Sequence, residues 1–367
     1  MKLYILKEAN LGETRVSIIP KSIKKLEKLG FDVSIVKGAG VAAAFDDDSY
    51  RNEGASLATS NEEAISKADV LVKINPPTEE EIAAMKSGQI IICQLFHRLR
   101  SDLIQKLSAK NVSAFSLDAM PRISRAQSMD VLSSQSNLSG YKAVIKGADH
   151  LGMIFPMLMT AAGTITPAKV LIFGVGVAGL QAIATAKRLG AVVEATDVRA
   201  ETKEQTESLG AKFISVENEG VKTEGGYAKE VSDEYLAKQK EAVNKSLYQA
   251  DLVITTALVQ GAKAPILISE EQIKNMKPGA VIVDMAVSKG GNTALSKADE
   301  VVEINGVKIV GVSNFPAQLP TNASQLLSRN IDTFLAHLVS EEKFNWDMED
   351  EITSGTLITH KGEILMQ

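Results

Sequence analysis

The chain has 367 residues, of which 45% are apolar and 23% are charged, a composition typical of soluble globular proteins rather than of disordered or membrane-embedded chains. This length favours two domains over one. The formal net charge of -5 provides no basic excess to hold a nucleic acid or an acidic membrane surface, so we expect no nucleic-acid partner.

The first third of the chain alternates short apolar runs with helical patterns. It opens on residues 1–8, which reach charged side chains too early for a secretion signal. The predicted strands are 32–36, 69–74, 89–93 and 111–115, and the predicted helices are 20–29, 60–67, 78–85 and 101–109. Gly30 and Gly88 stand where helices are expected to end. Strands and helices that alternate at this pitch predict parallel βαβ units.

Cys93, in the strand predicted for 89–93, is the only cysteine, which excludes an internal disulfide and is typical of a cytosolic protein. We interpret it as a small core thiol rather than a nucleophile. The four histidines are scattered, and none is paired with a cysteine at ligand spacing. We therefore expect no metal site.

Residues 116–168 break the alternation. A polar stretch, 121–139, leads into a segment predicted to be helical over 141–160. A polar stretch this long within a compact protein more often has a function than serves only as a connection. We predict that it crosses between domains. The longest apolar stretch, around 153–165, contains Pro156 and is shorter than the ~20 residues of a membrane span, so we expect a soluble chain. A membrane-bound partner is not excluded.

A second βαβ series follows. Its predicted strands are 169–173, 191–195, 252–256, 280–284 and 308–311, and its predicted helices are 177–189 and 202–209. Asn305 and Gly306, between two apolar runs, predict a hairpin. Glycine-rich residues 217–231 are interpreted as a mobile surface loop. A long amphipathic helix is predicted over 320–339, and we expect it to return the chain to the first domain.

These elements predict an α/β protein with two doubly wound Rossmann-like domains and a cofactor cleft between them. The first domain is discontinuous, formed by 1–133 with 319–367. The second, formed by 134–318, is the predicted nucleotide-binding domain.

The sharpest motif is the spacing of Gly174, Gly176 and Gly179 between a predicted strand and a predicted helix. The first glycine permits the tight turn, the second lets the main chain approach a pyrophosphate, and the third lets helix and strand pack closely. The amides near Val177 and Ala178 would face the phosphates at the positive end of the helix dipole. The motif therefore predicts a dinucleotide site.

Asp197 follows the next predicted strand, about 20 residues further on. A carboxylate in this position accepts hydrogen bonds from both ribose hydroxyls and repels a 2′-phosphate. Arg199 lies close enough to favour that phosphate, but Asp197 holds the deciding position. We therefore predict NAD(H) rather than NADP(H) as the cofactor of this domain.

The polar stretch contains Gln127, Asp130 and Ser133 at three-residue spacing, with Arg122 and Arg125 before them. Any helical turn here would place the three on one face. Together these side chains supply the donors and acceptors that a carboxamide such as nicotinamide requires. A solvated linker between domains explains the same pattern, and the pattern alone does not choose.

Three runs resemble the NAD(H)-binding components of proton-translocating NAD(P) transhydrogenases: 121–130 (Pro-Arg-Ile-Ser-Arg-Ala-Gln-Ser-Met-Asp), 174–180 (Gly-Val-Gly-Val-Ala-Gly-Leu) and 195–199 (Ala-Thr-Asp-Val-Arg). Further matching runs are 225–230, 255–258, 261–265 and 350–357. The resemblance extends from Glu8 to the C-terminus. The first run is specific to this family, whereas many families share the glycine motif.

The resemblance implies roles for individual residues. The nicotinamide end would be held by Arg122, Gln127, Asp130 and Ser133, the pyrophosphate by Val177 and its neighbours, and the adenosine ribose by Asp197, Val198 and Arg199. Gly226 and Tyr227 would belong to a mobile loop that closes over the nucleotide, and Gln239 and Leu258 would add contacts.

The resemblance also implies the activity and the partners. The chain would be a homodimer that passes hydride directly between NADH and NADP held on a partner subunit, while a membrane-spanning subunit couples the reaction to proton translocation. It would be cytoplasmic and peripheral on the inner face of the membrane. Transfer from carbon to carbon needs no side-chain acid or base, so catalysis would come from alignment and exclusion of water. We hypothesise that Gln127 and Asp130 fix the rotation of the nicotinamide ring.

Alanine dehydrogenase, which shares the two-domain plan, is the first alternative. Arg15 and Lys73 match residues that bind the keto acid in that enzyme. Against it, Ser288 replaces an aspartate, and the substrate-side histidine has no clear counterpart, because His97 stands several positions early. For Arg15 and Lys73 we favour charge pairing within the domain over substrate binding. A non-catalytic NAD(H)-sensing subunit is the second alternative.

Overall fold

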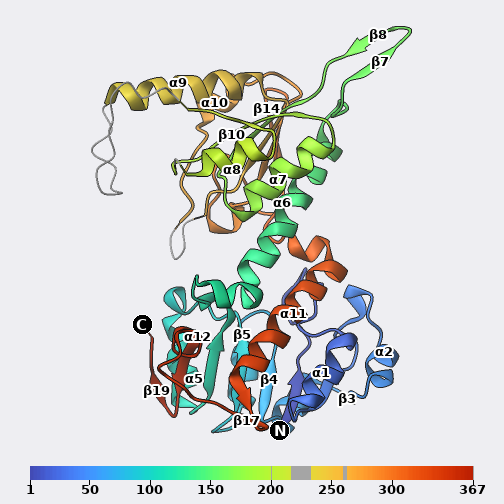
Figure 1. The fold of residues 1–367 in the computed structure, drawn as a ribbon, viewed down its shortest axis with the longest axis vertical. Coiled ribbons are helices and arrows are strands. Elements are labelled where there is room, and N and C mark those ends of the chain that lie inside the picture. Colours follow the sequence, from blue (N-terminus) through green and yellow to red (C-terminus); the bar gives the residue numbers. More distant parts are fainter. Residues whose placement is uncertain (200, 216–232, 259–262, 367) are drawn as a thin grey trace. The chain divides into compact units, whose positions relative to one another are not determined.

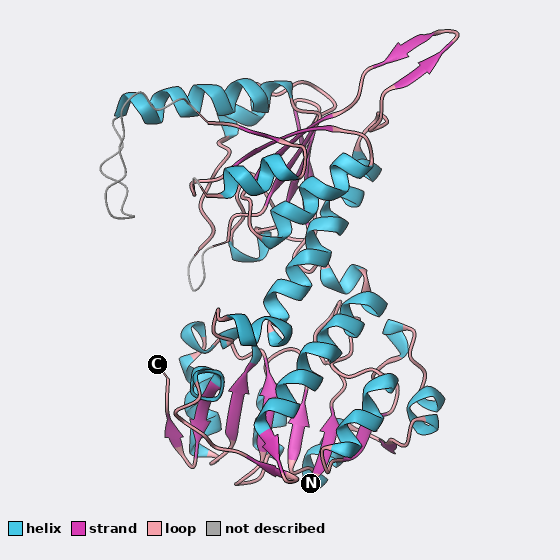
Figure 2. Ribbon diagram, viewed as in Figure 1, coloured by secondary structure: helices cyan, strands magenta, loops and turns pink. Residues whose placement is uncertain are grey.

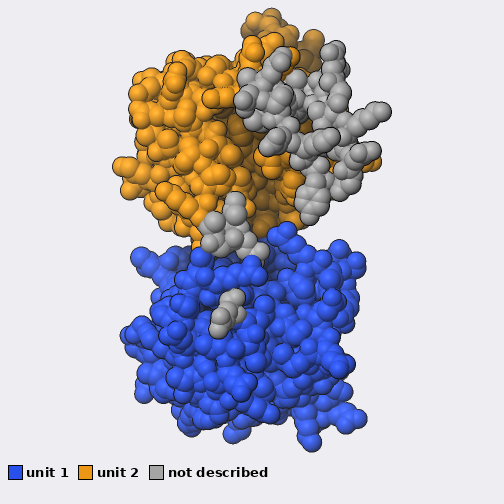
Figure 3. Space-filling view, turned by 90° about the vertical axis from the view of Figure 1, so that its left-hand side faces the viewer, with its two compact units in different colours: residues 1–135, 316–367 blue, residues 136–315 orange. Residues whose placement is uncertain are grey.

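The computed structural model describes residues 1–199, 201–215, 233–258 and 263–366, with only the helical backbone given for 233–237. It divides into two compact units, which Figure 3 shows in separate colours. Unit 1 consists of Met1–Gln135 with Pro316–Gln367, and unit 2 consists of Ser136–Phe315. Unit 1 is therefore assembled from both ends of the chain.

Unit 1 is built on an eight-stranded sheet (Figure 1). Its strands, in spatial order, are β19 (Glu363–Ile364), β18 (Leu357–His360), β6 (Ser113–Ser116), β5 (Ile90–Cys93), β4 (Val70–Val72), β1 (Lys2–Ile5), β2 (Asp32–Val36) and β3 (Ser56–Ala58). Strands β1 to β6 are parallel, and β18 and β19 are antiparallel. The order of the parallel strands reverses between β1 and β4, which makes this pair the topological switch point of unit 1.

The helices of unit 1 are α1 (Ile23–Lys28), α2 (Asp47–Asn52), α3 (Asn61–Lys67), α4 (Glu79–Ala84), α5 (Ser101–Ala109), α11 (Pro320–Leu338) and α12 (Glu351–Thr356). Apolar side chains pack on both faces of the sheet, so β4 and β5 are buried at every position. The Ser60 side chain caps α3, and Thr78 with Glu81 forms a capping box at α4. These caps explain why helices begin at the two positions predicted.

Unit 2 carries a seven-stranded sheet. Its strands, in spatial order, are β11 (Lys212–Phe213), β10 (Val192–Thr196), β9 (Lys169–Phe173), β12 (Leu252–Thr255), β13 (Val281–Asp284), β15 (Val307–Gly311) and β14 (Val301–Ile304). Its helices are α7 (Val177–Arg188), α8 (Thr202–Ser208), α9 (Asp233–Gln249) and α10 (Glu270–Lys274). All pairs are parallel except β14 with β15.

This order is that of a dinucleotide-binding Rossmann sheet, with its switch point between β9 and β12. The predicted fold class of two doubly wound α/β domains is therefore confirmed. The hairpin predicted at Asn305 and Gly306 is also confirmed, and both residues have positive φ, 50° and 76°, as a type I′ turn requires.

The helix predicted over 141–160 is wrong at both ends. Helix α6 runs from Val131 to His150, so it includes the polar residues before Tyr141, which the prediction places outside the helix. After it, β7 (Leu158–Thr160) and β8 (Gly163–Ile165) form an antiparallel ribbon that stands out from the rest of unit 2 (Figure 2). Gly163, at φ 127°, permits the turn between them. The loop predicted for 217–231 lies outside the described residues.

Among the described residues, no helix is both long enough and apolar enough to cross a membrane.

Candidate active site

The glycine motif forms a tight turn between β9 and α7 in unit 2. Gly174 has φ 91°, and its carbonyl accepts a 2.9 Å hydrogen bond from Oγ1 of Thr256, the residue directly after the neighbouring strand β12. A Cβ on Gly179 would collide with the Gly174 carbonyl, so helix and turn pack as closely as the motif predicts. A Cβ on Gly176 would meet only open space, which leaves the main chain there accessible to a ligand.

Asp197 lies directly after β10, the strand beside β9. Its carboxylate accepts hydrogen bonds from the Val175 amide at 2.7 Å and from the amide and guanidinium of Arg199 at 2.9–3.0 Å. Burial opposes the charged form, but the hydrogen bonds from Arg199 and Val175 outweigh it and lower the pKa of Asp197. The structure thus brings a charged carboxylate to the glycine turn.

The other residues predicted to contact the nucleotide lie on separate elements of unit 2. Val198 is almost fully exposed beside Asp197. Leu258 follows β12 and is 56% exposed. Gln239 is half-buried on α9. Gly226 and Tyr227 lie outside the described residues, so their predicted role stays a prediction.

The polar segment, residues 122–135 of unit 1, consists of two helical pieces that meet at Asp130. Ser124–Met129 is the 3-10 helix η5, and α6 begins at Val131. The Asp130 carboxylate caps α6 by accepting hydrogen bonds from the Ser133 amide at 2.9 Å and its hydroxyl at 2.6 Å. Asp130 and Ser133 are therefore in contact, whereas Gln127 and Arg122 expose their side chains to solvent.

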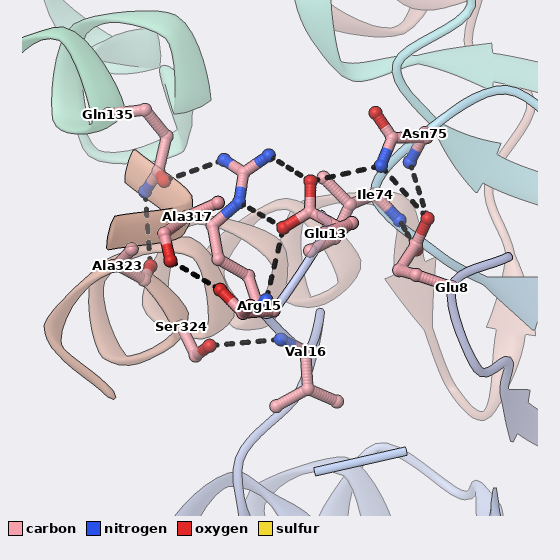
Figure 4. A network of polar contacts seen from close by, with 11 residues as sticks. Glu8, Glu13, Arg15, Val16, Ile74, Asn75, Gln135, Ala317, Ala323 and Ser324 are labelled. Atoms are coloured by element: carbon pink, nitrogen blue, oxygen red, sulfur yellow. Dashed lines mark hydrogen bonds and ion pairs between the residues drawn. The ribbon is translucent and has the colours of Figure 1, made fainter. Parts of the chain in front are cut away.

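A cluster of charged and amide side chains lies at the switch point of unit 1 (Figure 4). Arg15 donates from Nε and Nη2 to the Glu13 carboxylate at 2.8 and 2.6 Å, and from Nη1 to Gln135 Oε1 at 2.9 Å. Glu8 accepts a 2.6 Å hydrogen bond from the Ile74 amide, and burial raises its pKa. Arg15 is thus held by partners within the chain.

Lys73 also has a partner within the chain. Its ammonium lies 2.6 Å from the Glu81 carboxylate, and both side chains are buried. The interpretation of Arg15 and Lys73 as charge-paired residues is therefore what the structure shows.

His97 is also buried, neither of its ring nitrogens has a hydrogen-bond partner among the described residues, and burial lowers its pKa. Cys93 is fully buried, as predicted, and burial raises the pKa of its thiol.

The part of the chain that the structure describes contains no group of three or more His, Cys, Asp or Glu side chains able to hold a metal ion.

Two asparagines at these sites were not predicted. Asn292 is fully buried, and its carboxamide bonds to the amide and carbonyl of Ala257 and to the carbonyl of Pro265, beside Leu258. Asn330 on α11 contacts the polar segment. Asn330 is one of several polar residues buried on α11, so nothing in the sequence singled it out.

Residues 4–139 match the family model "Alanine dehydrogenase/PNT, N-terminal domain", and residues 143–367 match "Alanine dehydrogenase/PNT, C-terminal domain". The chain is 51% identical to an NAD(P) transhydrogenase alpha-subunit polypeptide of Rhodospirillum rubrum, over 100% of this chain and 98% of that protein. It is 30% identical to alanine dehydrogenase 1 of Staphylococcus aureus, over 91% and 87% of the two chains.

Two solved structures support the same grouping. A transhydrogenase from Sinorhizobium meliloti matches with a TM-score of 0.91 and 43% identity, over 99% of this chain and 100% of that one. An L-alanine dehydrogenase matches with a TM-score of 0.83 and 25% identity, over 99% and 96%.

Proposed function

The chain belongs to the alanine dehydrogenase/PNT family, and we propose that within it the chain is the NAD(H)-binding component of a proton-translocating NAD(P) transhydrogenase. Members of this family use nicotinamide nucleotides. The higher identity over the full length, 51% to a transhydrogenase alpha subunit against 30% to an alanine dehydrogenase, favours the transhydrogenase.

The observation that carries the nucleotide assignment is the contact of Asp197 with the glycine turn. A carboxylate held 2.7 Å from the Val175 amide stands where the ribose of a bound dinucleotide would meet it. Its lowered pKa keeps it charged at neutral pH, and the charge would repel a 2′-phosphate. This supports NAD(H) rather than NADP(H) on this chain, and in our proposal NADP(H) is held on a partner subunit.

The polar segment would hold the nicotinamide ring. Gln127 is exposed and supplies both a donor and an acceptor, and the Asp130 carboxylate is held in one orientation by Ser133. In our proposal the hydride passes from C4 of NADH to C4 of NADP⁺, with no proton transferred by the chain. The contribution of these residues would be alignment of the two rings and exclusion of water.

We also propose a homodimer and membrane-bound partner subunits, which place the chain at the cytoplasmic face of a membrane. Residues 151–168 carry no charged side chain, and Met157, Leu158, Met159 and Ile165 of the β7–β8 ribbon are 44–74% exposed. A two-stranded ribbon by itself is marginally stable, and an exposed apolar surface of this kind marks a site of contact with another protein. In our proposal the ribbon therefore forms part of the homodimer interface. Met159→Asp should convert a dimer to a monomer in light scattering, and an unchanged mass would remove the ribbon from the interface.

The rival assignment is an alanine dehydrogenase. Arg15 and Lys73 are present but each is paired with a carboxylate, and His97 is buried without a hydrogen-bond partner among the described residues. Turnover of pyruvate and ammonium by the chain alone would establish that assignment. Saturable NADH binding without hydride transfer to any partner would instead establish a sensing subunit.

The direct test of the proposal mixes the chain with the NADP(H)-binding subunit of a related transhydrogenase. We expect rapid reduction of an NADP⁺ analogue by NADH that requires both proteins. Intact NADH binding with no transfer to a partner active with its own NAD(H) component would refute the proposal.

A further inference from the structure

One face of α11 is linked to the polar segment 122–135 at three positions along the helix, the last of them through Asp350. Residues 323, 330 and 337 are seven apart, close to two helical turns, so they lie on the same side of the helix. The Ala323 carbonyl accepts a 3.1 Å hydrogen bond from Gln135. His337 contacts Asp350 at 2.8 Å, and Asp350 in turn forms a 2.8 Å ion pair with Arg125 of η5.

Asn330 makes the middle contact. Its side chain is buried, Nδ2 donates to the Ser128 carbonyl at 2.8 Å, and Oδ1 accepts from Ser134 Oγ at 2.7 Å. Ser128 lies in η5 and Ser134 in the first turn of α6. One carboxamide therefore joins the two helical pieces across the corner at Asp130.

This corner has weak support from its own backbone. The hydrogen bond from the Asp130 amide to the Gln127 carbonyl is 3.4 Å long, and Asp130 leaves helical geometry with ψ 96°. Hydrogen bonds in 3-10 helices are generally poorer than those in α-helices. A side chain that ties both sides of the corner therefore helps to fix where Gln127 and Asp130 stand.

We propose that Asn330 is a positioning residue for the nicotinamide ring, which acts by fixing the η5–α6 corner that carries Gln127 and Asp130. The inference rests on the proposed function, in which this segment holds the ring. Both halves of the carboxamide are used, one as donor and one as acceptor. Aspartate has nearly the same shape but no donor, and its charge would face the Ser128 carbonyl.

The test compares Asn330→Asp with Asn322→Asp, the same change at an exposed position of the same helix. Three quantities are measured: affinity for NADH, affinity for ADP-ribose, which lacks nicotinamide, and the rate of hydride transfer to the NADP(H)-binding partner. We expect Asn330→Asp to lower the transfer rate about 10- to 100-fold, the scale of effect expected when reacting groups are misplaced. Its ADP-ribose affinity should be unchanged, and Asn322→Asp should match the wild type.

Ser134→Ala provides a second variant with little risk to folding, because it removes one of the two bonds to Asn330. It should slow transfer in the same direction by a smaller factor. In the Gln127→Ala background, Asn330→Asp should have little further effect if the two residues act through one geometry.

An Asn330→Asp variant that transfers hydride at the wild-type rate would overturn the inference, and so would one that loses ADP-ribose and NADH affinity equally. A wild-type chain that binds NADH no more tightly than ADP-ribose and transfers no hydride would overturn the proposed function together with it.

Discussion

The amide of Val175 donates a 2.7 Å hydrogen bond to the carboxylate of Asp197, so the acidic residue predicted to meet the ribose is fixed against the turn predicted to meet the pyrophosphate. The contact follows from the parallel pairing of β9 with β10, which ends both strands at the same edge of the sheet. Arg199 bonds to the same carboxylate through Nε and Nη2. Ribose hydroxyls would therefore compete with the Arg199 guanidinium for Asp197.

Asp197→Asn should weaken NADH binding and relax the discrimination against NADPH. Hydrogen bonds to a charged group contribute about 1.5–3 kcal/mol, which corresponds to roughly 10- to 100-fold in affinity. NADPH should bind the variant more tightly than it binds the wild type, because the repulsion of the 2′-phosphate is removed while Arg199 is freed. Fluorescence titrations with both nucleotides measure this. Equal affinity of the wild type for NADH and NADPH would contradict the role of Asp197.

Gly176→Ala and Gly179→Ala should separate binding from stability. A Cβ at position 179 collides with the Gly174 carbonyl, so this variant should lose about 1–3 kcal/mol of stability, as overpacked sites do. A Cβ at 176 meets nothing within 4 Å, so that variant should keep its stability within about 0.5 kcal/mol yet lose NADH affinity. Urea unfolding and NADH titration on both variants provide the measurement. Wild-type NADH affinity in Gly176→Ala would show that no phosphate approaches this position.

Most helices and strands of the two βαβ series could be predicted, because their helix caps and apolar runs agree with the positions that they take in the fold. Helices α3 and α4 begin at side-chain caps, and β9 is an apolar run followed at once by the glycine turn. Strands β1 and β3 were not predicted, and they lie parallel to β2 on either side of it. The error at α6 has a local cause, since Asp130 and Ser133 have the spacing of a helix cap as well as that of a pair of ligands.

The buried pair of Lys73 and Glu81 should be far more important for stability than an exposed pair. Lys73→Met leaves the Glu81 carboxylate buried without its cation, and breaking such a pair costs about 3–5 kcal/mol. The control is Lys67→Met, which breaks the partly exposed 2.7 Å pair with Glu63 and should change stability by less than about 0.5 kcal/mol. Both are measured by urea unfolding at neutral pH. Equal midpoints for the two variants would contradict the expected cost of leaving Glu81 buried without its cation.

Asp350 should make the stability of unit 1 depend on acid. Burial opposes its charge, but hydrogen bonds from the Thr353 amide and from His337 hold its pKa below the usual value of 3.8. A carboxyl group whose pKa is lowered in the folded state contributes stability that is complete above the unfolded value and is lost as the pH falls through the folded value. The difference in free energy of unfolding between the wild type and Asp350→Asn should therefore shrink as the pH falls below 3.8. A difference that grows over this acidic range would contradict the assignment.

The nucleotide turn could be predicted from the sequence because its residues lie within one βαβ unit. The contacts of Asn330 could not, because Ser128 and Asn330 are 202 residues apart and meet only after α11 has returned to unit 1. The same holds for Arg15 and Gln135, which are 120 residues apart. Residues this far apart in the chain do not form a short sequence motif, so their contact could not be predicted from their spacing.

The most direct test of the central claim follows the hydrogen atom itself. NADH that carries deuterium at both C4 positions is mixed with the chain, the NADP(H)-binding partner and an NADP⁺ analogue, and the reduced product is examined by mass spectrometry. The account predicts that the label appears on the product without dilution by solvent hydrogen, and only when both proteins are present. A product that carries solvent hydrogen, or one formed by the partner without this chain, would contradict direct hydride transfer from NADH held on this protein.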